Sequence, residues 1–441
     1  MNSTSTQIPP DLPERTEVAI IGAGIAGCAT AYFLAKAGVP VVVLEKGRIA
    51  GEQSSRNWGW VRKQGRDPRE LPAIIESLKI WPEFESELEA DIGWKQAGVT
   101  YVATDEAQMA RFEEWLGFAK PYQLDSRLLT PKETDDLLGT SGERYLGALH
   151  TPSDGRAEPS AVVPAIARAI ERLGGRVIDG CAVRTLDTQA GRVAGIVTEH
   201  GRISCGSVVC AAGAWSSLFN RNHGIALPQL RVCSSVMRTN PAPLVTQSAT
   251  WCGEFAFRRR QDGGYTIAGD GGSTFEIVPD AFRYFLPFLR ALRMSRKDLR
   301  IRFSTSEFFR QLRALRRWGP DDVTPFERTR VLDPTPDAAV LSKALEAARA
   351  TLAGFKDIQM AESWAGMIDV TPDLIPVLCA VDRPQGYYIA TGFSGHGFGL
   401  GPGAGLLMSE LITTGKARVD LTDFRLGRFF DGTKMIPYAP I

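Results

Sequence analysis

The hydrophobic positions of this chain fall into short runs that are separated by glycine-rich turns and by stretches with helical spacing. The first run, residues 18–21, leads into three glycines within six residues, and an alanine-rich stretch covers residues 28–36. A second apolar run covers residues 39–44. Short apolar runs bounded by turn residues are typical of buried strands, so this region predicts a strand, a tight turn, a helix and a second strand.

The later part of the chain repeats this alternation. Apolar residues recur at helical spacing over 160–173, where Gly174 and Gly175 predict the end of a helix, and strands are predicted over 192–198 and 207–213. Near the C-terminus, a predicted strand at 387–391 runs into a glycine-rich turn and a helix over 405–413. Helices and strands that alternate in this way predict an α/β fold.

The composition is close to the average of soluble globular proteins. The chain has 441 residues, enough for two intertwined domains or one large α/β enzyme. Hydrophobic residues make up 44% and charged residues 23%, which excludes disordered, collagen-like and disulfide-scaffold classes. The 51 basic and 50 acidic residues leave a net charge of +1, so no overall field favours nucleic acid as a partner.

Cysteines, histidines and the N-terminal residues indicate which kinds of site and which cellular location to expect. The seven cysteines contain no C-x-x-C pair and the four histidines are dispersed, so we expect neither a disulfide framework nor a metal site, and a reducing, cytoplasmic location. Residues 1–14 are polar and are predicted to form a flexible tail. No apolar run approaches the roughly 18 residues of a membrane span, so neither a signal peptide nor a span is expected.

The three N-terminal glycines carry the first chemical signal. Gly22, Gly24 and Gly27 have the G-x-G-x-x-G spacing between a strand and a helix, and Glu45 ends the second strand. In this arrangement the backbone approaches a pyrophosphate, the helix N-terminus faces its charge, and the acid accepts a hydrogen bond from a ribose hydroxyl. The pattern predicts a dinucleotide site for either FAD or NAD. The glycine-rich turn and helix near the C-terminus favour FAD, because a helix N-terminus there suits the negative charge of a reduced flavin.

Five ordered motifs carry a family resemblance over nearly the whole chain. They are Glu45-Lys46-Gly47 after the glycine fingerprint, Ser54-Ser55-Arg56-Asn57, the stretch from Ala211 through Ala212 and Gly213 to Trp215, the stretch Trp364 to Asp373, and Gly392-Phe393-Ser394-Gly395-His396-Gly397-Phe398. These residues resemble the FAD-dependent amine oxidoreductases of the D-amino acid oxidase superfamily, in particular the branch that holds glycine oxidase and monomeric sarcosine oxidase.

The resemblance implies the fold class and the domain organisation. We expect an α/β, two-domain FAD-dependent oxidoreductase with a Rossmann-like FAD-binding domain and a substrate domain built on a mainly antiparallel sheet with helices. The expected FAD-binding pieces are residues 15–85, 150–225 and 360–441, and the expected substrate-binding pieces are 86–149 and 226–359.

The resemblance also implies the cofactor contacts. The candidate FAD-binding residues are Gly22, Gly24, Gly27, Glu45, Lys46, Ser54, Ser55, Arg56, Asn57, Trp58, Val183, Ala212, Gly213, Trp215, Gly366, Asp373, Gly395, His396, Gly397 and Phe398.

Three positions depart from the family pattern. Gly366 stands where monomeric sarcosine oxidase attaches its flavin through a cysteine, so we expect noncovalent FAD. Ile368 stands where glycine oxidase has an arginine for the substrate carboxylate. Gly399 stands where the sarcosine oxidases have a lysine.

Arg62 is the candidate that replaces these missing anchors. By residue count it falls near an arginine that binds the substrate carboxylate in sarcosine oxidases, and a guanidinium pairs with a carboxylate through two parallel bonds. The alternative is that it pairs with a surface acid. Trp58 and Trp60 are two residues apart and are expected on one face of an extended segment, either walling a pocket or packing in the core. The candidate substrate-site residues are Arg62, Trp60, Ile368 and His396, and hydrogen bonding or backbone positioning at the flavin is favoured over proton transfer for the histidine.

The resulting hypothesis is oxidation of the C–N bond of an amine or amino acid, primary or N-alkylated. Hydride passes to flavin N5, and the imine product is hydrolysed. The electron acceptor is oxygen or another compound. The sarcosine oxidases carry a lysine over the flavin that promotes reaction with oxygen, and the matching strand at 264–270 has none, which favours a slow oxidase or a dehydrogenase. A flavin-dependent monooxygenase and a non-catalytic flavoprotein scaffold are the alternatives.

Residues 281–317 form a strongly basic segment with eleven basic and two acidic residues. Its first part places apolar residues three or four apart, which predicts an amphipathic helix. A solvated face or a subunit contact is the preferred interpretation, and contact with an anionic membrane is the alternative. The oligomeric state stays open.

Overall fold

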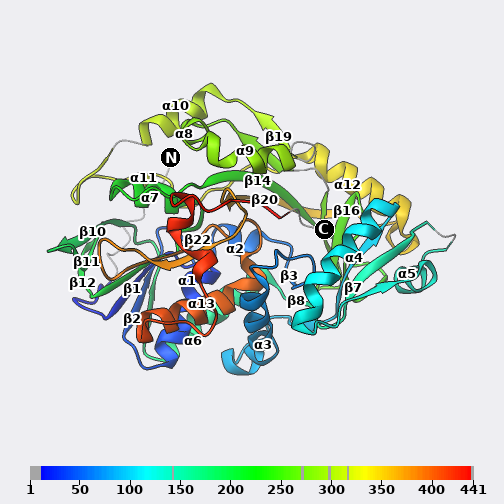
Figure 1. Cartoon of the computed structure of the whole chain (residues 1–441), viewed down its shortest axis with the longest axis horizontal. Helices are drawn as coiled ribbons and strands as arrows, with labels where there is room; N and C mark the ends of the chain where they lie inside the picture. Colours follow the sequence, from blue (N-terminus) through cyan, green and yellow to red (C-terminus); the bar gives the residue numbers. More distant parts are fainter. Residues whose placement is uncertain (1–10, 142–143, 270–272, 296–298, 315–316, 439–441) are drawn as a thin grey trace.

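The computed structural model of the protein describes residues 11–141, 144–269, 273–295, 299–314 and 317–438. Figure 1 shows a layered α/β molecule in which two large sheets meet near the centre. Of the predicted flexible tail at 1–14, the first ten residues lie outside the described part.

The first large sheet has six strands in the order β21-β22-β13-β1-β2-β9. All neighbours are parallel except β21 and β22. The strands are β1 (Val18–Ile21), β2 (Val41–Leu44), β9 (Arg176–Ile178), β13 (Ser207–Cys210), β21 (Val377–Ala380) and β22 (Tyr387–Thr391). Every residue of β1 and β2 is buried, as expected for parallel strands that are covered on both faces.

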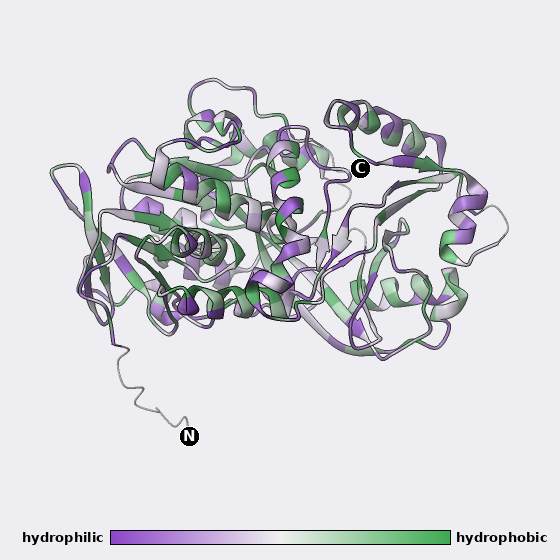
Figure 2. Ribbon diagram, turned by 90° about the horizontal axis from the view of Figure 1, so that it is seen from below, coloured by the Kyte–Doolittle hydropathy of each residue, from purple (hydrophilic) through white to green (hydrophobic). Residues whose placement is uncertain are grey.

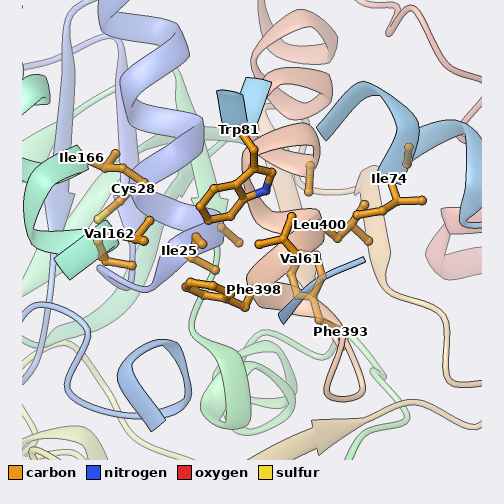
Figure 3. Close-up of a cluster of buried hydrophobic side chains, with 14 of the residues drawn as sticks. Ile25, Cys28, Val61, Ile74, Trp81, Val162, Ile166, Phe393, Phe398 and Leu400 are labelled. Carbon is orange, nitrogen blue, oxygen red and sulfur yellow. The ribbon is translucent and has the colours of Figure 1, made fainter. Parts of the chain in front are cut away.

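Alternate residues of β1 explain how the two faces are covered. Val18 and Ile20 pack in a cluster with the helices α1 (Ile25–Lys36), α3 (Leu71–Leu88), α6 (Pro159–Arg172) and α13 (Gly397–Thr414). Ala19 and Ile21 pack instead against β10 (Val183–Gln189), β11 (Arg192–Thr198) and β12 (Gly201–Ser204), a three-stranded antiparallel sheet. Side chains of a strand alternate between its two faces, so four residues of β1 serve two cores. Figure 3 shows the helical cluster, with Trp81 next to Ile25 and Phe398.

The second large sheet is mainly antiparallel and runs in the order β19-β18-β14-β17-β16-β15-β5-β7-β6, with β20 paired to β14. The strands are β5 (Val99–Ala103), β6 (Arg127–Leu129), β7 (Gly147–Thr151), β14 (Leu230–Thr239), β15 (Ala249–Trp251), β16 (Phe255–Arg259), β17 (Tyr265–Gly269), β18 (Ser273–Glu276), β19 (Leu299–Arg302) and β20 (Met360–Val370). The helices α4 (Glu106–Ala119), α5 (Pro131–Leu138) and α12 (Ala338–Thr351) pack on this sheet. The expected fold class is therefore confirmed, while the residue limits of the two domains stay a prediction.

Shorter elements lie outside the two large sheets, and three of them, β3, β8 and β4, form a small sheet of their own. They are α2 (Gln53–Arg56), β3 (Trp60–Val61), β4 (Lys95–Gln96), β8 (Gly155–Arg156), α7 (Ser216–Asn222), α8 (Pro279–Arg283), α9 (Phe285–Met294), α10 (Thr305–Ala314) and α11 (Pro325–Arg328). The helix predicted over 160–173 is confirmed by α6, and the strand predicted over 387–391 is confirmed by β22. Figure 2 shows hydrophobic residues gathered along packed strands and helices and many hydrophilic residues in loops. Within the described ranges, no helix combines the length and apolar character needed to cross a membrane.

Two helix predictions need correction. The helix predicted over 405–413 begins eight residues earlier, at Gly397, because tertiary contacts stabilise a stretch that glycines would otherwise destabilise. The helix predicted in the basic segment is divided into α8 and α9 at Tyr284, which is buried.

Candidate active site

A cavity of about 510 Å³ lies at the carboxyl ends of four parallel strands. Gly22 after β1, Glu45 after β2, Ala211 after β13 and Thr391 at the end of β22 all line it. Ligands of open α/β sheets bind at this edge, where the loops after the strands leave a crevice. The opposite wall of the cavity comes from β14 and β20 of the second sheet.

The glycine fingerprint lets the backbone turn tightly at this edge. Gly22 has a φ of +106°, and a Cβ on it would lie 2.5 Å from the carbonyl oxygen of Ala211. A Cβ on Gly24 would lie 3.1 Å from Ser54 Oγ, which accepts a hydrogen bond from the Ile25 backbone N–H at 2.9 Å. Gly24 itself carries no side chain, so the N-terminus of α1 lines the cavity and its backbone can approach a pyrophosphate closely.

Glu45 lies next to this helix start. Its carboxylate accepts hydrogen bonds from the backbone N–H groups of Ala23 at 3.0 Å and Gly47 at 2.8 Å. Burial raises the pKa of Glu45, and these two donors partly oppose the rise. Each oxygen keeps a further lone pair, so the carboxylate can still accept a ribose hydroxyl.

Lys46 and Trp215 form one wall of this end of the cavity. The ammonium of Lys46 lies 2.7 Å from Glu52 Oε1 and 4.6 Å from the centre of the Trp215 ring. The indole N–H of Trp215 donates to the same Glu52 oxygen at 3.0 Å. Arg56 is also occupied, because it donates to Asp333 and to the Ala365 carbonyl, both at 2.8 Å. These cations shape the wall and have partners within the protein.

The other end of the cavity lies at the N-terminus of α13. His396 is the N-cap residue, and Gly395, Gly397 and Phe398 line the cavity beside it. Gly366 and Ile368 of β20 line the cavity as well. The cavity therefore connects the N-terminus of α1 with that of α13.

His396 forms a buried pair that the sequence does not reveal. Its Nδ1 lies 3.0 Å from Oε2 of Glu70, which is 0% exposed. Burial lowers the pKa of His396 and nearby Arg66 lowers it further, so the neutral ring donates to the carboxylate. Burial acts to raise the pKa of Glu70, but the histidine and the two nearby arginines outweigh it and keep the pKa below its usual range. The pair holds the imidazole in one orientation at the start of α13.

Arg62 lies among aromatic side chains. Trp58 and Trp60 both line the cavity, with ring centres 5.4 Å apart. The guanidinium of Arg62 lies 5.4 Å from the centre of the Tyr101 ring and donates to the carbonyl oxygen of Gln64. Arg62 lines the cavity, with one of its donors already used, and its role in binding substrate stays a prediction.

Arg66 is a further cationic residue of the cavity, four residues beyond Arg62 in a non-helical segment. It is 3% exposed, and its Nε donates to the carbonyl oxygen of Arg62 at 3.1 Å. Its buried Nη1 has no hydrogen-bond partner within the described residues. Burial, followed by the charge of Arg62, lowers the pKa of Arg66 to about 10, so it stays a cation at neutral pH. The signal in the sequence was a second arginine four residues after Arg62, but its burial was not visible there.

Most of the candidate residues line the cavity. The ones that line it are Gly22, Gly24, Glu45, Lys46, Ser54, Arg56, Asn57, Trp58, Trp60, Arg62, Val183, Ala212, Gly213, Trp215, Gly366, Ile368, Gly395, His396, Gly397 and Phe398. Lining residues that the sequence analysis missed are Glu52, Gln53, Arg66, Ser234, Ser273 and Asp369.

Three candidate cofactor contacts lie elsewhere. Gly27 packs under the turn, where a Cβ would lie 2.1 Å from the Gly22 carbonyl oxygen. Ser55 donates to the Ala50 carbonyl oxygen at 2.7 Å. Asp373 accepts two hydrogen bonds from the buried Arg428, at 2.9 and 3.1 Å, and so fixes the segment near the C-terminus. Their roles are structural because each is already engaged inside the protein.

The parallel sheet, the open start of α1 and the acid at the end of β2 define the class of dinucleotide-binding α/β proteins. The chain belongs within it to the DAO family of FAD dependent oxidoreductases, whose family model matches residues 17–411. The residues described above fit FAD, because an open glycine turn and a carboxylate lie at one end of the cavity and a second helix N-terminus at the other.

Known relatives agree with the family. Sarcosine dehydrogenase, mitochondrial, from Mus musculus is 24% identical over 95% of this chain, which covers only 42% of that protein. Sarcosine oxidase subunit beta from Rhodobacter capsulatus is 25% identical, with 96% and 92% of the two chains covered. The solved structure of L-amino acid deaminase from Proteus myxofaciens in complex with anthranilate is 29% identical, with a TM-score of 0.91 and 95% of each chain covered. The family resemblance seen in the sequence is thereby confirmed.

Proposed function

We propose that this protein oxidises the C–N bond of an amino acid, either primary or N-alkylated, with noncovalently bound FAD. One observation carries the proposal, namely a buried arginine with an unpaired donor, Arg66, next to Arg62 in the same cavity as the glycine cradle. An unpaired buried cation is costly, and a substrate carboxylate supplies the partner that the protein does not. Gly366 supports noncovalent binding, because it offers no side chain for a flavin link.

The charges at this end of the cavity favour a single carboxylate. Arg62 and Arg66 contribute two positive charges, Glu70 contributes one negative charge, and the lowered pKa of His396 leaves the ring neutral. The two neighbouring guanidinium groups can pair with one carboxylate on a substrate whose amine reacts in its neutral form. The names of the relatives, which include sarcosine and L-amino acids, support the same substrate class.

Each wall of the cavity has a task in the proposed reaction. FAD held by the glycine turn at Gly22 and Gly24, Glu45 and the start of α13 would supply the two-electron acceptor for the α-carbon hydride, and water would hydrolyse the imine product. Arg62 and Arg66 orient the carboxylate, Trp58 and Trp60 exclude water, and the N-terminus of α13 stabilises negative charge nearby. His396 stays bonded to Glu70 and positions that helix start.

An anaerobic flavin-reduction screen tests the function. The purified holoenzyme is mixed with L- and D-amino acids, N-methyl amino acids, opines and polyamines, and flavin absorbance is followed. We expect bleaching by amino acids with one carboxylate. Bleaching by NADPH alone supports a monooxygenase, and a flavin that no amine and no NADPH bleaches supports a scaffold; both results contradict the proposal.

We also propose an acceptor other than oxygen and a reducing location. The sarcosine oxidases, which this chain resembles, use the ammonium of a lysine near the flavin to promote reaction with oxygen. Strand β17 has no lysine within its described residues 265–269. All seven cysteines are free, and six of them are buried. Free, buried thiols support a cytoplasmic location.

A further inference from the structure

The segment from α8 to α10 exposes an unusual amount of apolar surface. Seven of the sixteen exposed large hydrophobic side chains among the described residues lie between positions 282 and 312. Phe282 is 68%, Leu286 78% and Phe303 61% exposed. Single exposed apolar residues are common, but such a concentration in about thirty residues marks an interaction site.

Three aromatic side chains of this segment gather around Phe308. The ring of Phe308 lies 6.2 Å from Phe282, 5.9 Å from Phe303 and 5.9 Å from Phe309, centre to centre. Parallel pairing of β19 with β18 sets the position of Phe303, just after the last paired residue, Arg302. Figure 1 shows α8, α9 and α10 together on the outside of the molecule, beyond β14.

The apolar side chains that this surface exposes are not the ones that hold the segment in place. Tyr284, Phe288 and Ala291 are the buried residues of α8–α9, and they pack in a small cluster with Leu230 of β14. Phe285 and Leu286 in the same helix are 51% and 78% exposed. A helix that is apolar on two sides is stable in water only when something covers its second side.

Arginines surround the apolar side chains. Arg283, Arg290, Arg293, Arg302, Arg310 and Arg313 are all exposed, whereas Asp280 and Glu307 are the acids among the described residues of 279–314. Both acids are already paired, Asp280 with Arg221 at 2.9 Å and Glu307 with Arg310 at 2.5 Å. Within the described part of the chain, Arg293, Arg302 and Arg313 form no ion pair.

We propose that this arginine–aromatic surface, formed by the described residues 279–295 and 299–314, docks the protein onto an anionic lipid membrane. Aromatic side chains enter the boundary between headgroups and acyl chains, and arginines around them pair with lipid phosphates. A second copy of the chain is a poorer occupant, because a twofold contact would place this excess of arginines against itself. Docking goes beyond the proposed oxidation and does not depend on it.

Vesicle flotation at low salt tests the surface directly. The holoenzyme is mixed with vesicles of phosphatidylglycerol and phosphatidylcholine, or of phosphatidylcholine alone. We expect flotation with the anionic vesicles only. Reversing three unpaired charges, in R293E/R302E/R313E, should weaken binding roughly a hundredfold, since each basic residue near an anionic surface contributes about one kcal/mol.

Matched variants distinguish binding through this surface from a general effect of protein charge or of exposed apolar side chains. R111E/K132E/R168E makes the same charge change at exposed positions elsewhere and should float like the wild type. F285S/L286S should lose the binding that survives at high salt, whereas L244S/V323S, which removes two side chains that are both 53% exposed, should keep it. Circular dichroism melts establish that each variant is folded.

Three results would overturn the proposal. They are absence of flotation at low salt, equal flotation with phosphatidylcholine vesicles, and equal loss in R111E/K132E/R168E. A dimer in light scattering that becomes monomeric in F285S/L286S, without vesicle binding, would assign the surface to self-association instead.

Discussion

Arg62 and Arg66 lie four residues apart and line one cavity, yet they are bonded differently. Arg62 stacks on Tyr101 and donates to a carbonyl, whereas Arg66 keeps a buried donor unpaired. Removing one partner of a buried charge pair costs more than weakening an exposed one. The residue whose environment is incomplete without a ligand is therefore Arg66.

This difference predicts the effects of two substitutions. Arg66→Ala and Arg62→Ala should each reduce kcat/KM by an amount equivalent to about 2–5 kcal/mol, with the larger loss for Arg66, while FAD content is unchanged. Binding of a substrate analogue with one carboxylate, measured by its perturbation of the flavin spectrum, should weaken in parallel and partly recover in Arg66→Lys.

Arg69 supplies the control, because it pairs with Asp67 at 2.7 Å and does not line the cavity. Arg69→Ala should leave binding of the same carboxylate analogue intact. Wild-type binding in Arg66→Ala would remove Arg66 from the substrate site.

His223 gives a prediction about stability and pH. Burial lowers its pKa to about 4, and its Nε2 accepts a hydrogen bond from the Leu186 backbone N–H at 3.3 Å. The unfolded chain takes up a proton below about pH 6.5, while the folded protein does not until about pH 4. The contribution of neutral His223 to the free energy of unfolding is therefore fully present above pH 6.5 and is lost as the pH falls towards 4.

The expected size of this loss is about 2–3 kcal/mol. His223→Gln keeps an acceptor and does not titrate, so its free energy of unfolding should fall less over that range. Urea titrations at pH 7, 5.5 and 4 measure the difference, and parallel curves for the two proteins would contradict it.

At the scale of elements, α13 forms against its intrinsic preference. It contains Gly397, Gly399, Gly401, Gly403 and Gly405, as well as Pro402. Ser77 of α3 inserts into its backbone, donating to the Gly399 carbonyl at 2.6 Å and accepting from the Gly403 N–H at 3.0 Å. Close contact with α1 and α3 stabilises the helix, so local sequence alone placed its start too late.

Gly405 tests this close contact. A Cβ there would lie 2.5 Å from the backbone carbonyl carbon of Ala29 in α1. Gly405→Ala should therefore lower the free energy of unfolding by about 1–3 kcal/mol, as overpacking does. Gly117 in α4 is the matched control, because its Cβ would meet nothing within 4 Å.

The same change at Gly117 should have the opposite sign, a gain of up to about 1 kcal/mol, since alanine favours helix more than glycine does. Thermal or urea unfolding of both variants measures the contrast. Equal stability of Gly405→Ala and the wild type would show that α1 and α13 can separate at little cost.

For the whole molecule, the mode of flavin attachment is the first prediction. Gly366 leaves no side chain to form a bond, and a Cβ at this position would lie 3.4 Å from Arg56 Cβ. Acid precipitation should release the yellow chromophore into the supernatant. Colour that stays with the protein pellet would show a covalent link elsewhere.

The electron acceptor is the second prediction at this scale. With no lysine on β17, air should reoxidise the reduced enzyme much more slowly than the enzyme turns over with an artificial acceptor. Stopped-flow reoxidation in air-saturated buffer measures this rate. Reoxidation as fast as turnover would make the protein an efficient oxidase.

The sequence by itself determined the parts of this protein that local chemistry specifies. The strand, glycine turn, helix and acid from residue 18 to residue 45 are contiguous, so their spacing alone predicts the cradle, and ordered motifs identify the family. Tertiary structure decided what depends on distant neighbours. It buried Arg66 with one donor unpaired, paired His396 with Glu70, and turned Asp373 toward Arg428. It also extended α13 and left Phe282 and Leu286 exposed, because burial and pairing are set by segments far away in the chain.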